Sequence, residues 1–349
     1  MAARPLVHEQ TALDEVPNDV SAMATNDGDD LPLSTLRAQF AIWTRLIRPS
    51  ALLLVLTPAL TALLLLWIRG ARLLPVPALT GVISLTLIQG GASLLDVYLE
   101  FARRAHITEP DRRDQLTARA LLARSGIHPM NVLRVSMLLM AFGALAGIPL
   151  VLSGGWPVVI LGVIGITIAF LFSATSFALK RFAWADLIIG LALGPGIVVG
   201  MMLAQHHAPT GRDLLFAGAL GLLAMLPAEG AHLRDADQDK LLGRKTLVTL
   251  LGNGVGKAVY LFCALGGMAL IALAALPSGA PHGALLAFFA LPLFSIPISG
   301  ALLAKTGDAR LQLVLQELRA YAIFAALLLF GLLINALLVR GLGPVPPVV

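Results

Sequence analysis

Cysteine, aromatic side chains and charge are all scarce in this chain of 349 residues. Its one cysteine, Cys263, excludes a disulfide within the chain and lies in an apolar run, so we expect a buried structural thiol. Charged residues make up 13% and hydrophobic residues 58%. A soluble globular domain has about 25% charged and about 45–50% apolar residues. The composition therefore argues against a soluble domain and indicates a membrane protein.

The net charge of +5 does not indicate a nucleic-acid partner. Most basic residues lie between long apolar runs, and only 3 Tyr and 4 Trp accompany them. Basic loops between apolar segments are typical of proteins oriented in a membrane. We therefore expect a lipid bilayer around the chain and no nucleic acid.

The first 36 residues lack the apolar core of a secretory signal. They hold acidic residues among Pro, Asn, Ser and Gly: Glu9, Asp14, Glu15, Asp19, Asp27, Asp29 and Asp30. Such a composition does not bury enough apolar surface to fold. We predict a disordered acidic tail over residues 1–36 and a membrane domain over 37–349.

Long apolar runs dominate the rest of the chain. The apolar core of a bilayer is about 30 Å thick, so a helix that crosses it needs about 20 mostly apolar residues. Nine segments meet this condition: 42–67, 77–101, 131–153, 156–177, 183–204, 213–232, 257–276, 283–304 and 320–340. We therefore predict an all-α integral membrane protein, a bundle of nine transmembrane helices.

Basic residues are distributed unevenly between the loops that join these segments. One side holds only Arg69, Arg72, Arg212 and Arg340, whereas the other side holds nearly all remaining Lys and Arg. Cytoplasmic loops carry the excess of basic residues, so we predict a cytoplasmic N-terminus and an external C-terminus. Beyond the tail, Asp213 is the one acid on the external side. Polar chemistry is therefore expected at the cytoplasmic face.

The most informative stretch is RDADQDKLLGRKTLVTLLG at 234–252. Asp235 and Asp239 are four residues apart, so both carboxylates project from one face if a helix runs through them. Paired carboxylates suit Mg²⁺, which often bridges to substrate phosphates. Asp237 falls on another face, and Lys240, Arg244 and Lys245 offer positive charge to a diphosphate. The alternative is a solvated loop of mixed charge.

A second acidic pair, Asp96 and Glu100, lies near the cytoplasmic end of segment 77–101. Charged groups at membrane depth are costly and usually face a polar interior. Glu100 alone would fit the headgroup region, but Asp96 lies about one turn deeper. Two facing acidic clusters with nearby Arg and Lys would bind Mg²⁺ and a diphosphate, and the apolar bundle would house an isoprenoid tail.

These motifs resemble those of the UbiA superfamily of intramembrane prenyltransferases. The resemblance rests on IRPSALLLVLTPALTALLL at 47–65, LKRFAWADLIIGLALGPGIVVG at 179–200, SGIHP at 125–129 and, most specifically, RDADQDKLLGRKTL at 234–247. The last motif is closest to the branch that prenylates dihydroxynaphthoate for menaquinone. The resemblance covers the chain from its first apolar segment to about residue 260.

The resemblance implies roles for particular residues. Asp235 and Asp239 would be catalytic metal ligands, and Asp96 and Glu100 would complete the metal site, with Glu100 replacing the usual Asp. The substrate would contact Lys180, Arg234, Arg48 and Lys245, of which Lys180 would also be catalytic. The sequence departs from the family at Ala92 and Ser93, where the first motif normally opens with Asn-Asp. It departs again at Ala231 and His232, which often are Asn.

Three other polar residues have no motif behind them. We expect Asp186 to cap or orient segment 183–204, Glu229 to support the metal site, and His232 to tune the membrane interface.

The expected function is Mg²⁺-dependent transfer of a prenyl group from a polyprenyl diphosphate to a lipophilic aromatic acceptor such as a quinone precursor. A bacterial inner membrane is the expected location. The alternatives are a membrane transporter, a non-catalytic UbiA-like protein, or the same fold with a non-quinone acceptor. A transporter often shows repeat symmetry and places ionisable residues near the midplane. This sequence shows no repeat, and its charges crowd one face, which favours the enzyme.

Overall fold

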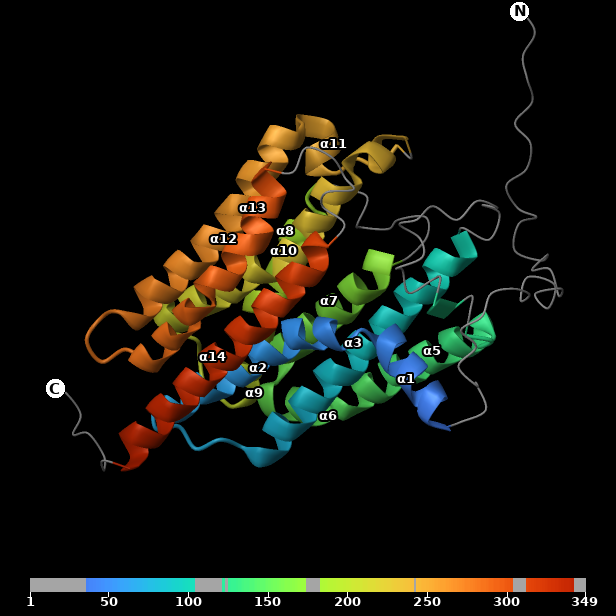
Figure 1. Cartoon of the computed structure of the whole chain (residues 1–349). Coiled ribbons are helices and arrows are strands. Elements are labelled where there is room, and N and C mark those ends of the chain that lie inside the picture. The colour runs from blue at the N-terminus through green and yellow to red at the C-terminus, as the bar shows by residue number, and fades with distance from the viewer. Residues whose placement is uncertain are drawn as a thin grey trace, which may run out of the picture.

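The computed structural model describes residues 36–103, 121–122, 125–173, 183–241, 243–303 and 312–341. Almost all of the predicted acidic tail, the basic segment 104–120 and Lys180 lie outside the described residues. Helices dominate the part that is described, which confirms the predicted all-α fold (Figure 1). In chain order they are α1 (Leu36–Ile47), α2 (Pro49–Ile68), α3 (Pro75–Arg103), α5 (Pro129–Ala146), α6 (Ile148–Gly154), α7 (Trp156–Ser173), α8 (Ala185–Leu191), the π-helix η4 (Ala192–Gly196), α9 (Ile197–Ala204), α10 (Gly211–Leu241), α11 (Leu247–Leu251), α12 (Asn253–Ala275), the 3₁₀ helix η5 (His282–Ala290), α13 (Leu291–Leu303) and α14 (Leu313–Gly341).

Eight helical spans among the described residues are long and apolar enough to cross a membrane. They correspond to eight of the nine predicted segments, and several consist of two consecutive helices, such as α5 with α6. The segment predicted at 156–177 forms α7, a shorter apolar helix. The chain is therefore an integral membrane protein, and the count of nine crossings stays a prediction.

The bundle has a large core and a small one. The large core joins α2, α9, α10, α12, α13 and α14, with Phe216, Tyr260 and Phe324 fully buried in it. The small core joins α1, α3 and α5 around Leu46 and Leu94. In Figure 1, α3 and α5 lie side by side in one part of the bundle, while α12, α13 and α14 form another.

Two ion pairs fix which helix ends lie together. Arg48, at the start of α2, reaches Asp96 near the end of α3 with an Nη1–Oδ2 distance of 3.2 Å. Arg69, just after the end of α2, reaches Asp213 at the start of α10 with an Nη1–Oδ2 distance of 2.9 Å. The start of α10 therefore lies at the end of α2, so α10 returns toward the end that holds Asp96. We call this end of the bundle, marked by Asp96 and the C-terminal turns of α10, the polar end.

The helix α10 is longer than the predicted segment 213–232. It continues without a break to Leu241 and carries Asp235 and Asp239 within the helix. The predicted segment is its apolar part, and the observed continuation meets the condition under which both carboxylates were expected on one face. Lys, Gln and Leu are good helix formers, and the helix extends past its apolar part.

The span formed by α8, η4 and α9 packs very closely against α10. A Cβ atom at Gly194 would overlap the carbonyl oxygen of Ala217 and backbone atoms of Gly221, and one at Gly190 would overlap Met225. Small residues of this kind allow helix backbones to approach closely in membranes. The π-helix accommodates Pro195 within this span. This packing fixes the register between the two elements.

Candidate active site

The C-terminal turns of α10 present two carboxylates at the polar end. Asp235 and Asp239 are four residues apart on one continuous helix, so they share a face as the spacing predicts. Asp239 is 2% exposed, and the side chain of Asp235 is 22% exposed. Asp237 is exposed, in agreement with its predicted place on another face.

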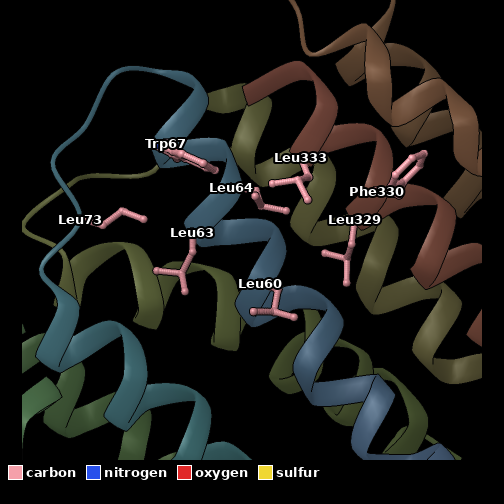
Figure 2. A pocket seen from close by; sticks show the side chains of 8 residues that line it. All are labelled: Leu60, Leu63, Leu64, Trp67, Leu73, Leu329, Phe330 and Leu333. Atoms are coloured by element: carbon pink, nitrogen blue, oxygen red, sulfur yellow. The ribbon is translucent and has the colours of Figure 1, made fainter. Parts of the chain in front are cut away.

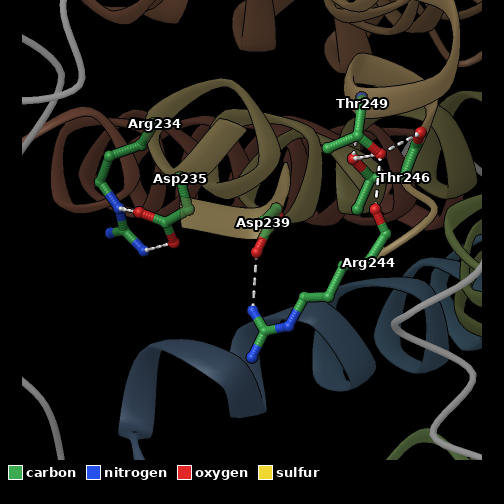
Figure 3. A network of polar contacts seen from close by, with 6 residues as sticks. All are labelled: Arg234, Asp235, Asp239, Arg244, Thr246 and Thr249. Atoms are coloured by element: carbon green, nitrogen blue, oxygen red, sulfur yellow. Dashed lines mark hydrogen bonds and ion pairs between the residues drawn. The ribbon is translucent and has the colours of Figure 1, made fainter. Parts of the chain in front are cut away.

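Each of the two carboxylates is paired with an arginine (Figure 3). Arg234 donates two hydrogen bonds of 2.7 Å, from Nε and Nη2, to the two carboxylate oxygens of Asp235. Arg244 donates one of 2.8 Å from Nη1 to Oδ1 of Asp239. Both arginine side chains remain partly exposed, at 27% and 31%. The site therefore combines inward carboxylates with guanidinium groups that reach toward the surface, a set that suits a metal–diphosphate complex.

A tight turn after α10 places Arg244. Gly243 has φ of 65°, a left-handed conformation that favours glycine. Its N–H bonds the carbonyl of Lys240, and the N–H of Arg244 bonds the carbonyl of Asp239 at 2.9 Å. These two bonds form a Schellman motif that ends the helix. The turn thereby brings the Arg244 side chain back beside Asp239, which is not predictable from spacing alone.

The following residues hold this turn in place (Figure 3). Thr246 caps α11, and its hydroxyl accepts a hydrogen bond from the N–H of Thr249 at 3.3 Å. The hydroxyl of Thr249 in turn donates to the carbonyl of Arg244 at 2.7 Å. Thr246 and Thr249 therefore support the position of Arg244.

The second acidic pair lies on α3 at the same end of the bundle. Asp96 is paired with Arg48, whose φ of 57° places it in the left-handed region just before α2. Glu100 is partly buried one turn further along α3. Ala92 and Ser93, where the family's first motif has Asn-Asp, are buried and offer no carboxylate. The predicted acidic pair therefore lies at the polar end, with Asp96 beside Arg48, and its role in binding a metal stays a prediction.

Two further residues, Lys180 and Lys245, were predicted to bind substrate. Lys180 falls outside the described residues, and its contact with a diphosphate stays a prediction. Lys245 follows Arg244, and its residue is exposed. Its role in binding substrate also stays a prediction.

A third polar group was not assembled by sequence reasoning. Asp186 on α8 meets Glu229 and His232 on α10, and one ligand atom from each lies within 4.8 Å of the others. The Glu-x-x-His spacing at 229–232 was the available signal, since residues three apart share a helix face. The partner Asp186 comes from another helix, and only the packing of α8 against α10 reveals it.

An apolar cavity of about 300 Å³, open on one side where Phe330 and Leu333 are exposed, lies between α2 and α14 (Figure 2). It is found beside the second half of α2, toward the end opposite Asp96 and Arg48. Its lining is wholly apolar and consists of Leu60, Leu63, Leu64, Trp67, Leu73, Leu329, Phe330 and Leu333. A hydrocarbon chain is the kind of ligand that such a lining accepts.

Known proteins resemble this chain in sequence and in fold. The model of the UbiA prenyltransferase family matches residues 55–309. The chain is similar to the 1,4-dihydroxy-2-naphthoate octaprenyltransferase of Bacillus subtilis (strain 168), with 23% identity over 231 residues that cover 66% of this chain and 72% of that protein.

Solved structures show the same fold. A UbiA homologue from Archaeoglobus fulgidus bound to DMAPP and Mg²⁺ has a TM-score of 0.54 and 15% identity, covering 84% of this chain and 98% of that one. The apo structure of a UbiA homologue from Aeropyrum pernix K1 has a TM-score of 0.55 and 15% identity, covering 77% and 97%.

Proposed function

The chain belongs to the UbiA prenyltransferase family, and on this premise we propose the reaction that it catalyses. We propose that it transfers a prenyl group from an isoprenyl diphosphate to an aromatic acceptor dissolved in the membrane. The observation that carries the proposal is the pair Asp235 and Asp239, which share one face of α10 at the polar end, each beside an arginine.

The donor set at this site fits Mg²⁺. Asp235 and Asp239 offer carboxylate oxygens, the ligands that Mg²⁺ prefers, and Asp96 and Glu100 would supply further oxygens from α3. The Archaeoglobus fulgidus homologue, bound to DMAPP and Mg²⁺, supports both the cofactor and an isoprenyl diphosphate as donor. When bound, Mg²⁺ would stabilise the negative charge that develops on the departing diphosphate.

The arginines would change partners when the substrate binds. Arg234 and Arg244 neutralise Asp235 and Asp239 in this structure. Once the carboxylates hold the cation, the guanidinium groups are free to turn toward the diphosphate oxygens, which match their planar donors. Arg48, Lys180 and Lys245 are proposed to add positive charge. The bond between C1 and the diphosphate oxygen then breaks toward an allylic cation, with diphosphate as the leaving group. The acceptor carbon attacks C1 and then loses its proton, or carbon dioxide where that carbon carries a carboxylate, which restores the aromatic ring.

The acceptor is proposed to be a quinone precursor of the dihydroxynaphthoate type. The similar protein from Bacillus subtilis is named 1,4-dihydroxy-2-naphthoate octaprenyltransferase, and this name supports an aromatic acceptor and a long prenyl chain. A place in menaquinone biosynthesis follows from that acceptor. The polar end would face the cytoplasm of a bacterial inner membrane, since the basic residues gather there.

The cavity between α2 and α14 is proposed to hold the distal part of the prenyl chain. Its lining begins at Leu60, which is twelve positions after Arg48, or about 18 Å along α2 at 1.5 Å per residue. A long prenyl chain whose diphosphate is at the polar end reaches this depth, whereas a single five-carbon unit does not. The lining of the cavity would then determine the length of the prenyl chain that the protein accepts.

Turnover by the purified full chain tests the proposal. Radiolabelled geranylgeranyl diphosphate is incubated with 1,4-dihydroxy-2-naphthoate and other hydroxylated aromatic acceptors, with Mg²⁺ or with EDTA. We expect labelled product only with Mg²⁺ and a suitable acceptor. Product formed equally well in EDTA would refute the assigned metal chemistry. Absence of both product and donor binding would favour a transporter or a non-catalytic relative.

A further inference from the structure

The polar cluster formed by Asp186, Glu229 and His232 borders the carboxylate pair of the proposed active site but shares no residue with it, and His232 lies three residues before Asp235 on α10. Glu229 lies six residues before Asp235, about 9 Å along the axis of α10. Asp186 is 2% and Glu229 0% exposed, and the side chain of His232 is 12% exposed. The cluster therefore lies deeper in the bundle than Asp235.

Helix packing places these three side chains together. Gly194 lies against Ala217 and Gly221, and Gly190 lies against Met225, so α8 and η4 run antiparallel to α10. Asp186 lies about one turn before Gly190 on α8, and the antiparallel packing therefore places it opposite Glu229. The cluster is thus set by a close backbone contact that leaves little freedom for adjustment.

Among the described residues, the buried polar atoms of this cluster face one another and have no hydrogen-bond partner outside the cluster. Both carboxylate oxygens of Asp186, both of Glu229 and Nδ1 of His232 are buried without a hydrogen bond among the described residues. Oδ2 of Asp186 and Nδ1 of His232 are 3.2 Å apart, yet they are not aligned as a hydrogen bond. Two carboxylates in such surroundings are strongly disfavoured unless a cation or protons neutralise them.

We propose that Asp186, Glu229 and His232 bind one divalent transition-metal ion, Zn²⁺ by the chemistry of its donors, at a site distinct from that of the diphosphate. Glu-x-x-His on one helix with a carboxylate from a facing helix is a recurrent way to build metal sites inside helix bundles. An imidazole nitrogen among the ligands favours Zn²⁺ over Mg²⁺, which prefers oxygen alone.

The distances agree with a metal site. Zn²⁺ binds nitrogen and oxygen at about 2.0–2.2 Å, so neighbouring ligands in a tetrahedral site lie about 3.4 Å apart. The 3.2 Å between Asp186 and His232 matches this value, and the ligand atoms of all three residues are within 4.8 Å of one another. Small side-chain rotations close the wider gaps. Ligand atoms within 4.8 Å of one another leave no room for an aromatic acceptor between them.

The metal content of the purified protein tests the proposal without any assay of activity. The full-length protein is purified with a chelator, loaded with Zn²⁺, freed of excess metal and analysed by mass spectrometry of the metal. We expect about one Zn²⁺ per chain in the native protein and in D235N/D239N, since neither Asp235 nor Asp239 is among the three proposed ligands. Glu229→Gln and Asp186→Asn, which preserve shape, should each retain less than about one tenth of it.

Glu317→Gln is the matched control, because Glu317 is also a buried carboxylate, at 1% exposure, on α14. It should keep its Zn²⁺. Melting temperature with and without Zn²⁺ checks that each variant is folded, and a Zn²⁺-induced rise should appear in the native protein and E317Q but vanish in E229Q. Equal Zn²⁺ in E229Q and the native protein, loss of Zn²⁺ in D235N/D239N, or no Zn²⁺ in the native protein would each overturn the proposal. The last result would assign protons, not a metal, to the cluster.

Discussion

Arg244 donates a 2.8 Å hydrogen bond to Asp239, a carboxylate that is only 2% exposed, from a turn that begins directly after the same helix. The pair gives this carboxylate of the proposed active site a counter-charge. It also holds a guanidinium group ready beside the place where a diphosphate would bind.

Removal of this guanidinium tests its part in binding the donor. In Arg244→Ala we expect kcat/KM for the diphosphate donor to fall about 10- to 100-fold, because a hydrogen bond to a charged group contributes about 1.5–3 kcal/mol. Lys240→Ala removes an exposed cation from the last turn of α10 and serves as control. Steady-state kinetics at saturating acceptor measure both. An equal loss in the two variants would show that only the general positive charge of this end matters.

The turn that places Arg244 depends on Gly243. Its φ of 65° is unfavourable for any residue with a Cβ atom, so Gly243→Ala should cost about 1 kcal/mol of stability and lower turnover. Gly254→Ala is the control, since Gly254 lies inside α12 with open space around its Cβ position. There Ala should be neutral or stabilising. Thermal unfolding in detergent and turnover are measured together, and unchanged turnover in G243A would separate the turn from catalysis.

The close contact between η4 and α10 is a second point of structural sensitivity. Gly194→Ala would bring its Cβ into the carbonyl oxygen of Ala217, so the helices must separate. We expect a clear fall in melting temperature, because overpacking typically costs about 1–3 kcal/mol. Gly162→Ala in α7, where nothing lies near the Cβ position, should leave the melting temperature unchanged or higher. Comparable melting temperatures for the two variants would contradict the close packing.

The cavity between α2 and α14 is predicted to set the length of the prenyl donor. Leu64→Trp should reduce the rate with a long donor several-fold and leave the rate with geranyl diphosphate nearly unchanged, because the added ring fills the distal space. Ile160→Trp adds the same bulk on the exposed surface of α7 and should change neither rate. Competition between donors of different length is the measurement. A uniform loss in L64W for all donors would place the tail elsewhere.

The sequence was most informative about residues that are close along the chain. Spacing alone was enough to predict each acidic pair, Asp235 with Asp239 and Asp96 with Glu100. An α-helix completes a turn every 3.6 residues, so residues four apart share a face. Both pairs were predicted at one end for two reasons. Charged groups are costly inside a bilayer, and basic residues are concentrated in the loops of one side. The ion pairs Arg48–Asp96 and Arg69–Asp213 show that arrangement.

Features that depend on tertiary contacts were not predictable. The pairing of Arg244 with Asp239 needs the Schellman turn at Gly243, and the extension of α10 to Leu241 has no apolar periodicity to mark it. Asp186 meets Glu229 only because Gly194 and Gly221 fix the register of two helices. The sequence shows these glycines but does not show which helix they face.

Mg²⁺-dependent binding of radiolabelled geranylgeranyl diphosphate tests the central claim most directly, and it needs no knowledge of the acceptor. Asp239→Asn removes a carboxylate from the proposed site, and Asp237→Asn removes the exposed carboxylate two residues away on another face. We predict that the native protein and D237N bind the donor with Mg²⁺ but not with EDTA, and that D239N loses most of this Mg²⁺-dependent binding while remaining folded. Binding in D239N that equals that of D237N would contradict the assignment of the C-terminal turns of α10 as the diphosphate site.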